Sequence, residues 1–185
     1  MRTKDLGLLL LRAGVGGTLA AHGVQKLRNR EAVTGAFGQL GFARPDQAVL
    51  AAAACEVGGG ALLAVGAATP AAGAAAVGAM TVAVDVHRAN GFFAQQGGSE
   101  FPLALGVGAA ALALTGPGRW SVDRMLGHRL ARPWMAVAGC AVGVTAGAAV
   151  ARSRRVPDTE DDTVVDVRDP DSQEVEVADI EVARR

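Results

Sequence analysis

Five apolar stretches in succession constrain this chain more than any other feature of its sequence. They cover Leu6–Leu27, Ala48–Ala68, Ala71–His87, Phe101–Gly116 and Pro133–Ala151, and few charged residues interrupt them. A helix needs about 20 apolar residues, and at least about 17, to cross the hydrocarbon core of a bilayer. A soluble domain built from five such helices would have almost no polar faces to present to water. The sequence therefore predicts an all-α fold, a polytopic transmembrane helix bundle embedded in the lipid bilayer.

The start of the chain resembles a secretory signal in part. Arg2 and Lys4 precede a run of leucines, which is the usual beginning of a signal peptide. Arg12 interrupts that run, whereas the apolar region of a cleaved signal normally carries no charge. We therefore expect the first apolar stretch to be retained as the first membrane span.

Charge divides the chain into two unlike parts. Residues 1–151 contain 12 basic and 7 acidic side chains, whereas residues 152–185 contain 6 basic and 11 acidic ones. A high acidic fraction with few aromatic residues is typical of disordered segments. We expect 152–185 to be a mostly disordered, acidic soluble tail. The alternation of valine and charge in "TVVDVR" and "EVEVADIEV" leaves a β-hairpin as the alternative.

Ionisable residues of the first four spans gather in one half of the membrane. Successive spans alternate in direction, so one span ends on the side where the next begins. We call the side that holds Met1 side A and the opposite side, where the first span ends, side B. The residues expected to meet near side B, and to form a ligand-binding site, are His22, Lys26, Glu56, Asp85, His87 and Glu100.

Glu56 is the most informative of these residues because it lies about nine residues into the second span, roughly 12–14 Å deep. A carboxylate at this depth costs on the order of 2.5–3.5 kcal/mol, so it should face the bundle interior and have a partner. One interpretation is a packing device in which Glu56 bonds to His22 or His87. The other is a proton-handling or ligand-binding site, because imidazoles exchange protons near neutral pH. His22, Glu56 and His87 are then the candidate catalytic residues.

Several other residues are expected to have structural roles. Arg12, near side A, could pair with Asp123 or extend its head to the interface, and we favour the second. Gly59 permits close approach of a neighbouring helix. The same holds for the every-fourth-residue series Gly139, Gly143 and Gly147, whose partner could be the same chain or a second copy.

Four further residues have simpler interpretations. Trp120 and Trp134 are suited to anchor the protein at a membrane interface. Cys55 and Cys140 form no CxxC pair and no metal-ligand spacing, so no metal site is predicted. Both cysteines are expected to be small apolar fillers.

Four segments carry a resemblance to a known family. "LLRAGVGGTLAAHGVQKL", "CEVGGGALLAVGAATPAA", "DVHRANGFF" and "EFPLALGVGAAALALTGPGRWSVD", in this order and spacing, are similar to the DoxX family of small bacterial membrane proteins. The resemblance covers about residues 6–125. The positions that match recurrent residues of the family are His22, Gly23, Lys26, Glu56, Gly59, His87, Gly91, Phe92, Glu100 and Asp123.

The resemblance implies a domain organisation and a location. It implies a DoxX-like four-helix membrane core over 1–125, followed here by a linker and fifth transmembrane helix (126–151) and the acidic tail (152–185). It implies a multi-pass protein of the bacterial plasma membrane with its N-terminus inside. Basic residues, six near side A and eight near side B, do not decide the orientation by the positive-inside rule.

The resemblance also implies a redox role, because the family is named after its similarity to a subunit of a thiosulfate:quinone oxidoreductase and is linked to oxidative stress and thiol balance. The first hypothesis is a membrane component of a redox system, an accessory oxidoreductase subunit that holds a hydrophobic redox ligand such as a quinone against His22, Glu56 and His87. No cofactor motif is evident in the sequence, so any redox centre must be borrowed.

A second hypothesis is a non-catalytic membrane scaffold. Its bundle, fifth helix or acidic tail would recruit partners, either further copies of the chain or a soluble redox enzyme. A small-solute or lipid transporter is a third idea, which in so short a chain would require an oligomer. Nucleic acid is not an expected partner.

Overall fold

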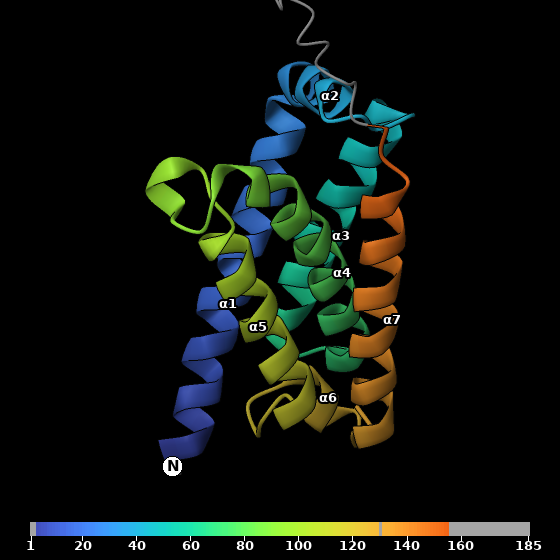
Figure 1. The fold of residues 1–185 in the computed structure, drawn as a ribbon. Helices are drawn as coiled ribbons and strands as arrows, with labels where there is room; N and C mark the ends of the chain where they lie inside the picture. The colour runs from blue at the N-terminus through green and yellow to red at the C-terminus, as the bar shows by residue number, and fades with distance from the viewer. Residues whose placement is uncertain (1–2, 130, 156–185) are drawn as a thin grey trace, which may run out of the picture.

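The computed structural model describes residues 3–129 and 131–155, and within them the regular structure is helical. The α-helices are α1 (Thr3–Arg28), α2 (Arg30–Gln39), α3 (Pro45–Val65), α4 (Thr69–His87), α5 (Glu100–Thr115), α6 (Val122–Met125) and α7 (Pro133–Arg152). Two short 3₁₀ helices, η1 (Arg88–Asn90) and η2 (Ala94–Gln96), lie in the α4–α5 connection. The long helices run side by side, with α2 and this connection at side B and α6 at side A (Figure 1).

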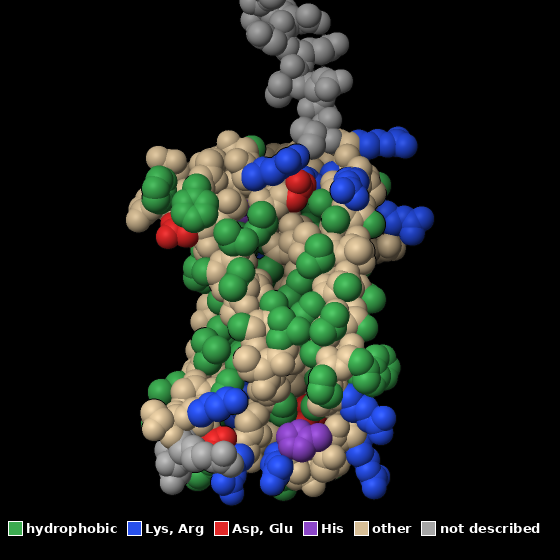
Figure 2. Space-filling view, turned by 60° about the horizontal axis from the view of Figure 1, so that its bottom comes forward, with side chains coloured by type: hydrophobic (Ala, Val, Ile, Leu, Met, Phe, Trp, Pro, Cys, Tyr) green, Lys and Arg blue, Asp and Glu red, His purple; other side chains and the backbone are tan. Residues whose placement is uncertain are grey.

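Four of the described helices are long and apolar enough to cross a membrane. They are α1, α3, α4 (counted to Asn90) and α7. Helix α5 is apolar as well but has 16 residues, so the crossing predicted for Phe101–Gly116 stays a prediction. Hydrophobic side chains cover the middle of the molecule, and lysine and arginine gather at its two ends (Figure 2). This distribution is the one expected of an integral membrane protein.

Local sequence explains where several helices begin and end. Pro45, Pro70 and Pro133 lie in the first turns of α3, α4 and α7, where the missing N–H of proline costs nothing. Helix α3 ends at Gly66, which adopts the left-handed φ of 67° that favours glycine. The tight turn between α3 and α4 therefore occupies residues 66–68, and Thr69 begins α4.

Helix α4 lies at the centre of the bundle, between α3, α5 and α7. The largest core cluster consists of Leu19, Leu63, Ala72, Ala76, Val77, Met80, Ala109 and Leu112. Three of these eight side chains are alanine methyl groups, which let the helix axes lie close together. The helix backbones approach each other most closely at glycine residues.

Helices α1 and α3 touch backbone to backbone. A Cβ added at Gly16 would lie 2.5 Å from the Gly60 carbonyl oxygen, and one at Gly60 would lie 2.6 Å from the Gly16 carbonyl oxygen. Gly59 faces the other way, where an added Cβ would lie 3.2 Å from the Ala72 oxygen of α4. Gly58 faces open space. The glycine triplet thus lets α3 contact two neighbours at once.

The glycine series of α7 packs on α4 of the same chain. An added Cβ would lie 2.9 Å from the Pro70 oxygen at Gly139, 2.5 Å from the Ala74 oxygen at Gly143 and 2.6 Å from the Gly78 oxygen at Gly147. The series is therefore occupied within the chain rather than offered to a second copy.

The first residues of the expected tail belong to the bundle. Helix α7 continues to Arg152, and the side chain of Arg154 is 8% exposed. Arg154, which the sequence analysis assigned to the tail, therefore packs against the bundle. The predictions made for 156–185, disordered tail or hairpin, lie outside the described residues.

Candidate functional site

A cavity of about 420 Å³ lies near side B, between α1, α3, α4, the α4–α5 connection and the start of α5. Its lining consists of Leu19, His22, Lys26, Glu56, Met80, Ala83, His87, Ala94, Gly97, Gly98, Phe101, Pro102 and Leu105. Its size lies in the range of small-molecule sites, about 300–1,000 Å³. The cavity brings together four of the six predicted ligand-binding residues: His22, Lys26, Glu56 and His87. We call it the side-B cavity.

A buried ion pair forms one wall of the side-B cavity. The Lys26 ammonium donates to both carboxylate oxygens of Glu56, over 2.6 and 2.5 Å. The Glu56 side chain is 3% exposed and that of Lys26 is 24% exposed. Gly23 allows this geometry, because a Cβ there would lie 2.9 Å from the Glu56 Cβ. The expectation that Glu56 bonds to His22 or His87 was wrong, because Lys26 is long enough to reach one helical turn deeper.

The two histidines are held by different contacts. The ring of His22 lies against Phe101, with centroids 5.2 Å apart. The Nδ1 of His87 lies 2.8 Å from the Gly97 carbonyl oxygen. A carbonyl only accepts, so we assign the proton to Nδ1, which leaves Nε2 of a neutral ring as an acceptor.

Asp85 and Glu100 do not line the cavity. Asp85 forms ion pairs with Arg154 and, over 3.0 Å, with Arg88. Glu100 accepts a hydrogen bond from the Ala94 backbone N–H over 2.9 Å and so closes the α4–α5 connection. Both carboxylates hold neighbouring segments together.

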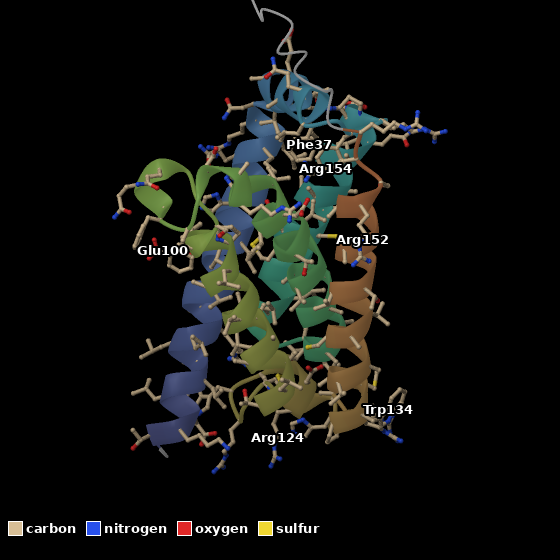
Figure 3. All side chains as sticks on the ribbon, viewed as in Figure 1. Phe37, Glu100, Arg124, Trp134, Arg152 and Arg154 are labelled. Atoms are coloured by element: carbon tan, nitrogen blue, oxygen red, sulfur yellow. The ribbon has the colours of Figure 1, made fainter. Side chains whose placement is uncertain are left out.

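Arg154 is the main residue that the sequence analysis missed. Besides Asp85 it contacts the α2–α3 connection, donating to the Leu40 carbonyl oxygen over 3.2 Å and lying 5.5 Å from the centre of the Phe42 ring. Figure 3 shows its place between α7 and the side-B end of the bundle. The sequence feature that could have predicted this role is the position of Arg154 just after an apolar span, on the same side of the membrane as Asp85, which needs a partner.

At side A, the outcome for Arg12 differs from the prediction. Its side chain is buried, with 1% exposed, instead of reaching the interface. The guanidinium donates to the carbonyl oxygens of Pro117 and Trp120, 2.5 Å each. These carbonyls follow the end of α5 and need donors. Within the described part of the chain, Arg12 and Asp123 form no ion pair.

Asp123 caps α4 from a distant part of the chain. Its carboxylate is fully buried and accepts from the backbone N–H of Ala68 (2.8 Å), the backbone N–H of Thr69 (2.9 Å) and the Thr69 hydroxyl (2.7 Å). These N–H groups have no acceptor inside the helix, and the positive end of the helix dipole favours an anion there. Ala68 is held at a φ of 43° by the same contact.

Comparison with known proteins gives one match. Residues 7–96 match the family model described as DoxX. The match includes both members of the Lys26–Glu56 pair and both histidines of the side-B cavity, and it ends before α5. No curated protein and no solved structure matches the chain. From this match, and from helices suited to cross a bilayer, we conclude that the chain is an integral membrane protein whose residues 7–96 match the DoxX family.

Proposed function

We propose that this chain is the membrane component of a redox system and that the side-B cavity holds the headgroup of a quinone. The observation that carries the proposal is the lining of that cavity. The Lys26–Glu56 pair, whose carboxylate is buried, and two imidazoles line one cavity together with apolar side chains. Ionisable groups inside a membrane protein are costly and usually functional.

The cavity offers what a quinone headgroup requires. Its carbonyl oxygens need N–H donors, which the Lys26 ammonium and the His22 imidazole can supply. Its ring needs apolar walls, which Leu19, Met80 and Phe101 supply. Mostly apolar surroundings with a few well-placed polar groups are typical of small-molecule sites.

When bound, a quinone accepts two electrons and two protons. A dithiol of a soluble partner would release two electrons and two protons as it forms a disulfide, which balances the reaction. The residues of the chain hold and pass the protons. The Nε2 of His87, left free when Nδ1 donates to the Gly97 carbonyl oxygen, is the atom that takes up a proton and returns it. Glu56, which accepts two hydrogen bonds from Lys26, connects the interior of the cavity to the more exposed ammonium.

The test is quinone binding to the purified full chain in lipid nanodiscs, with ubiquinone-1 as the probe. We expect saturable binding by equilibrium dialysis and a rise in the unfolding midpoint as the probe is added. Removing a donor costs on the order of 1 kcal/mol, so His22→Ala and His87→Ala should each weaken binding about three- to tenfold.

His128, the third histidine of the chain, is the matched control because it lies at side A. His128→Ala should bind ubiquinone-1 as the unaltered protein does. Absence of saturable binding, or equal losses in all three variants, would remove the proposal. Folding of each variant is checked by its elution as a single monodisperse species.

A further inference from the structure

We propose that a second cavity, at side A, binds the headgroup of an anionic phospholipid. This cavity of about 370 Å³ lies between the start of α1, the end of α5, the α5–α6 connection and the start of α7. The charged residues of its lining are Lys4, Arg119, Arg124, Arg132, His128 and Asp5. We call it the side-A cavity. It shares no residue with the side-B cavity.

Charge is the first argument. Four cations and a histidine line the side-A cavity against one carboxylate, and Figure 2, with side A turned forward, shows lysine and arginine around this end. At side B, four basic residues form ion pairs: Lys26, Arg30, Arg88 and Arg154, the last two with the same carboxylate of Asp85. Among the residues that the structure describes, the four cations of the side-A cavity form no such pair. Their positive charge is therefore available to an anion.

Depth in the membrane is the second argument. Trp120 and Trp134, 61% and 66% exposed, lie at side A, and Figure 3 shows Trp134 at the same end as Arg124. Exposed tryptophan is typical of the headgroup level of a bilayer. The lining also includes Leu8, Leu114 and Pro133, which suit the first carbons of an acyl chain. A free anion would have no use for these apolar walls.

The fold holds this site in place before any ligand binds. Buried Arg12 fixes the carbonyl groups of Pro117 and Trp120, on either side of Arg119. The backbone N–H of His128 donates to the Asp123 carbonyl oxygen over 2.7 Å, and His128 adopts the uncommon left-handed φ of 58°. Two buried charged residues thus position the segments that carry the cations, which lowers the entropy cost of binding.

The chemistry of the cations fits a phosphodiester. Guanidinium groups bind phosphate oxygens through two parallel hydrogen bonds. Basic pockets between membrane helices bind acidic lipid headgroups, and each cation near an anionic surface contributes about fivefold in affinity. We therefore assign the side-A cavity to a phospholipid with net negative charge, such as phosphatidylglycerol.

Titration of phosphatidylglycerol and phosphatidylcholine into the purified full chain, read by native mass spectrometry, tests the proposal. We expect phosphatidylglycerol to bind at least about tenfold more tightly. In the variant Arg119→Gln, Arg124→Gln, Arg132→Gln this preference should fall on the order of a hundredfold or vanish. Arg124→Gln alone should weaken binding about fivefold and keeps the test valid if the triple variant does not fold.

The matched control removes the same charge at side B, through Arg28→Gln, Arg30→Gln and Arg44→Gln, and should retain the preference. Equal affinity for both lipids, or an equal loss in the control, would overturn the proposal. Inorganic phosphate distinguishes the two sources of a phosphate group. If it displaces phosphatidylglycerol at an equal concentration, the site is one for free phosphate and the lipid assignment is wrong.

Discussion

The Lys26–Glu56 pair should respond very differently to the loss of one partner and to the loss of both. Lys26→Met removes the ammonium but keeps most of the stem. Glu56, with 3% of its side chain exposed, would then be a buried carboxylate without its partner. Breaking a buried pair in this way costs about 3–5 kcal/mol, and we expect the free energy of unfolding of Lys26→Met to fall by at least about 3 kcal/mol.

The opposite single change should cost less. In Glu56→Met the ammonium keeps its charge, but the Lys26 side chain is 24% exposed and can turn toward the headgroups. We expect a loss of about 1–2 kcal/mol, the cost of one charge-assisted hydrogen bond. Replacing both residues by methionine removes both charges from the interior, and should leave the protein within about 1 kcal/mol of the original.

Reversible unfolding by sodium dodecyl sulfate in mixed micelles, followed by circular dichroism, supplies the four free energies of this double-mutant cycle. Arg30→Met is the control, because Arg30 and Asp46 form an ion pair whose side chains are 47% and 53% exposed. Exposed pairs contribute at most about 1 kcal/mol. A double variant no more stable than Lys26→Met would refute the reasoning, since the remaining carboxylate could not then be the source of the loss.

Three further predictions concern helix contacts and are read by the same unfolding assay unless stated. Gly60→Ala should lower the free energy of unfolding by about 1–3 kcal/mol, because its Cβ would lie 2.6 Å from the Gly16 carbonyl oxygen. The control Gly58→Ala, whose Cβ would have nothing within 4 Å, should change it by less than about 0.5 kcal/mol. Equal effects of the two variants would contradict the α1–α3 contact. Asp123→Ala leaves two backbone N–H groups of the α4 start unpaired and should cost about 2 kcal/mol or more; a neutral result would mean that another acceptor replaces the carboxylate. Arg154→Gln should release residues 40–42, seen as faster deuterium uptake there by mass spectrometry, whereas unchanged uptake would mean that the contact is not made in solution.

The helices were predictable to the extent that hydropathy determines them. Apolar runs of about 20 residues have few alternatives to a membrane helix, and the proline and glycine signals lie at the observed ends of α3 and α7. Helices α2 and α6 have no counterpart among the predicted spans. They have ten and four residues, and neither carries a long apolar run. Their formation therefore depends on tertiary contacts, which the sequence pattern does not reveal.

The candidate site was predictable as a place but not as a set of contacts. Alternation of the spans placed four ionisable residues at one cavity. It could not choose the partner of Glu56, because the reach of a lysine side chain depends on how closely α1 and α3 approach. Nor could it pair Asp85 with Arg154, 69 residues away. The position of the Arg12 side chain was predicted wrongly because the sequence pattern, an arginine among leucines, is the same in both cases. It does not tell whether the side chain extends to the interface or turns inward to backbone carbonyls.

The backbone contact between α1 and α3 also bears on how a molecule dissolved in the bilayer could reach the side-B cavity. These helices cannot separate without parting at Gly16 and Gly60, whereas α1 meets α5 through side chains, among them the ring contact of His22 with Phe101. Phe101 lines the cavity and is also 43% exposed. We expect access to be lateral, past a rotating Phe101, so Phe101→Ala should speed both association and dissociation of ubiquinone-1, and unchanged rates would place the opening elsewhere. A protein arranged in this way takes its ligand from the lipid phase, and its occupancy then follows the composition of the bilayer rather than that of the surrounding water.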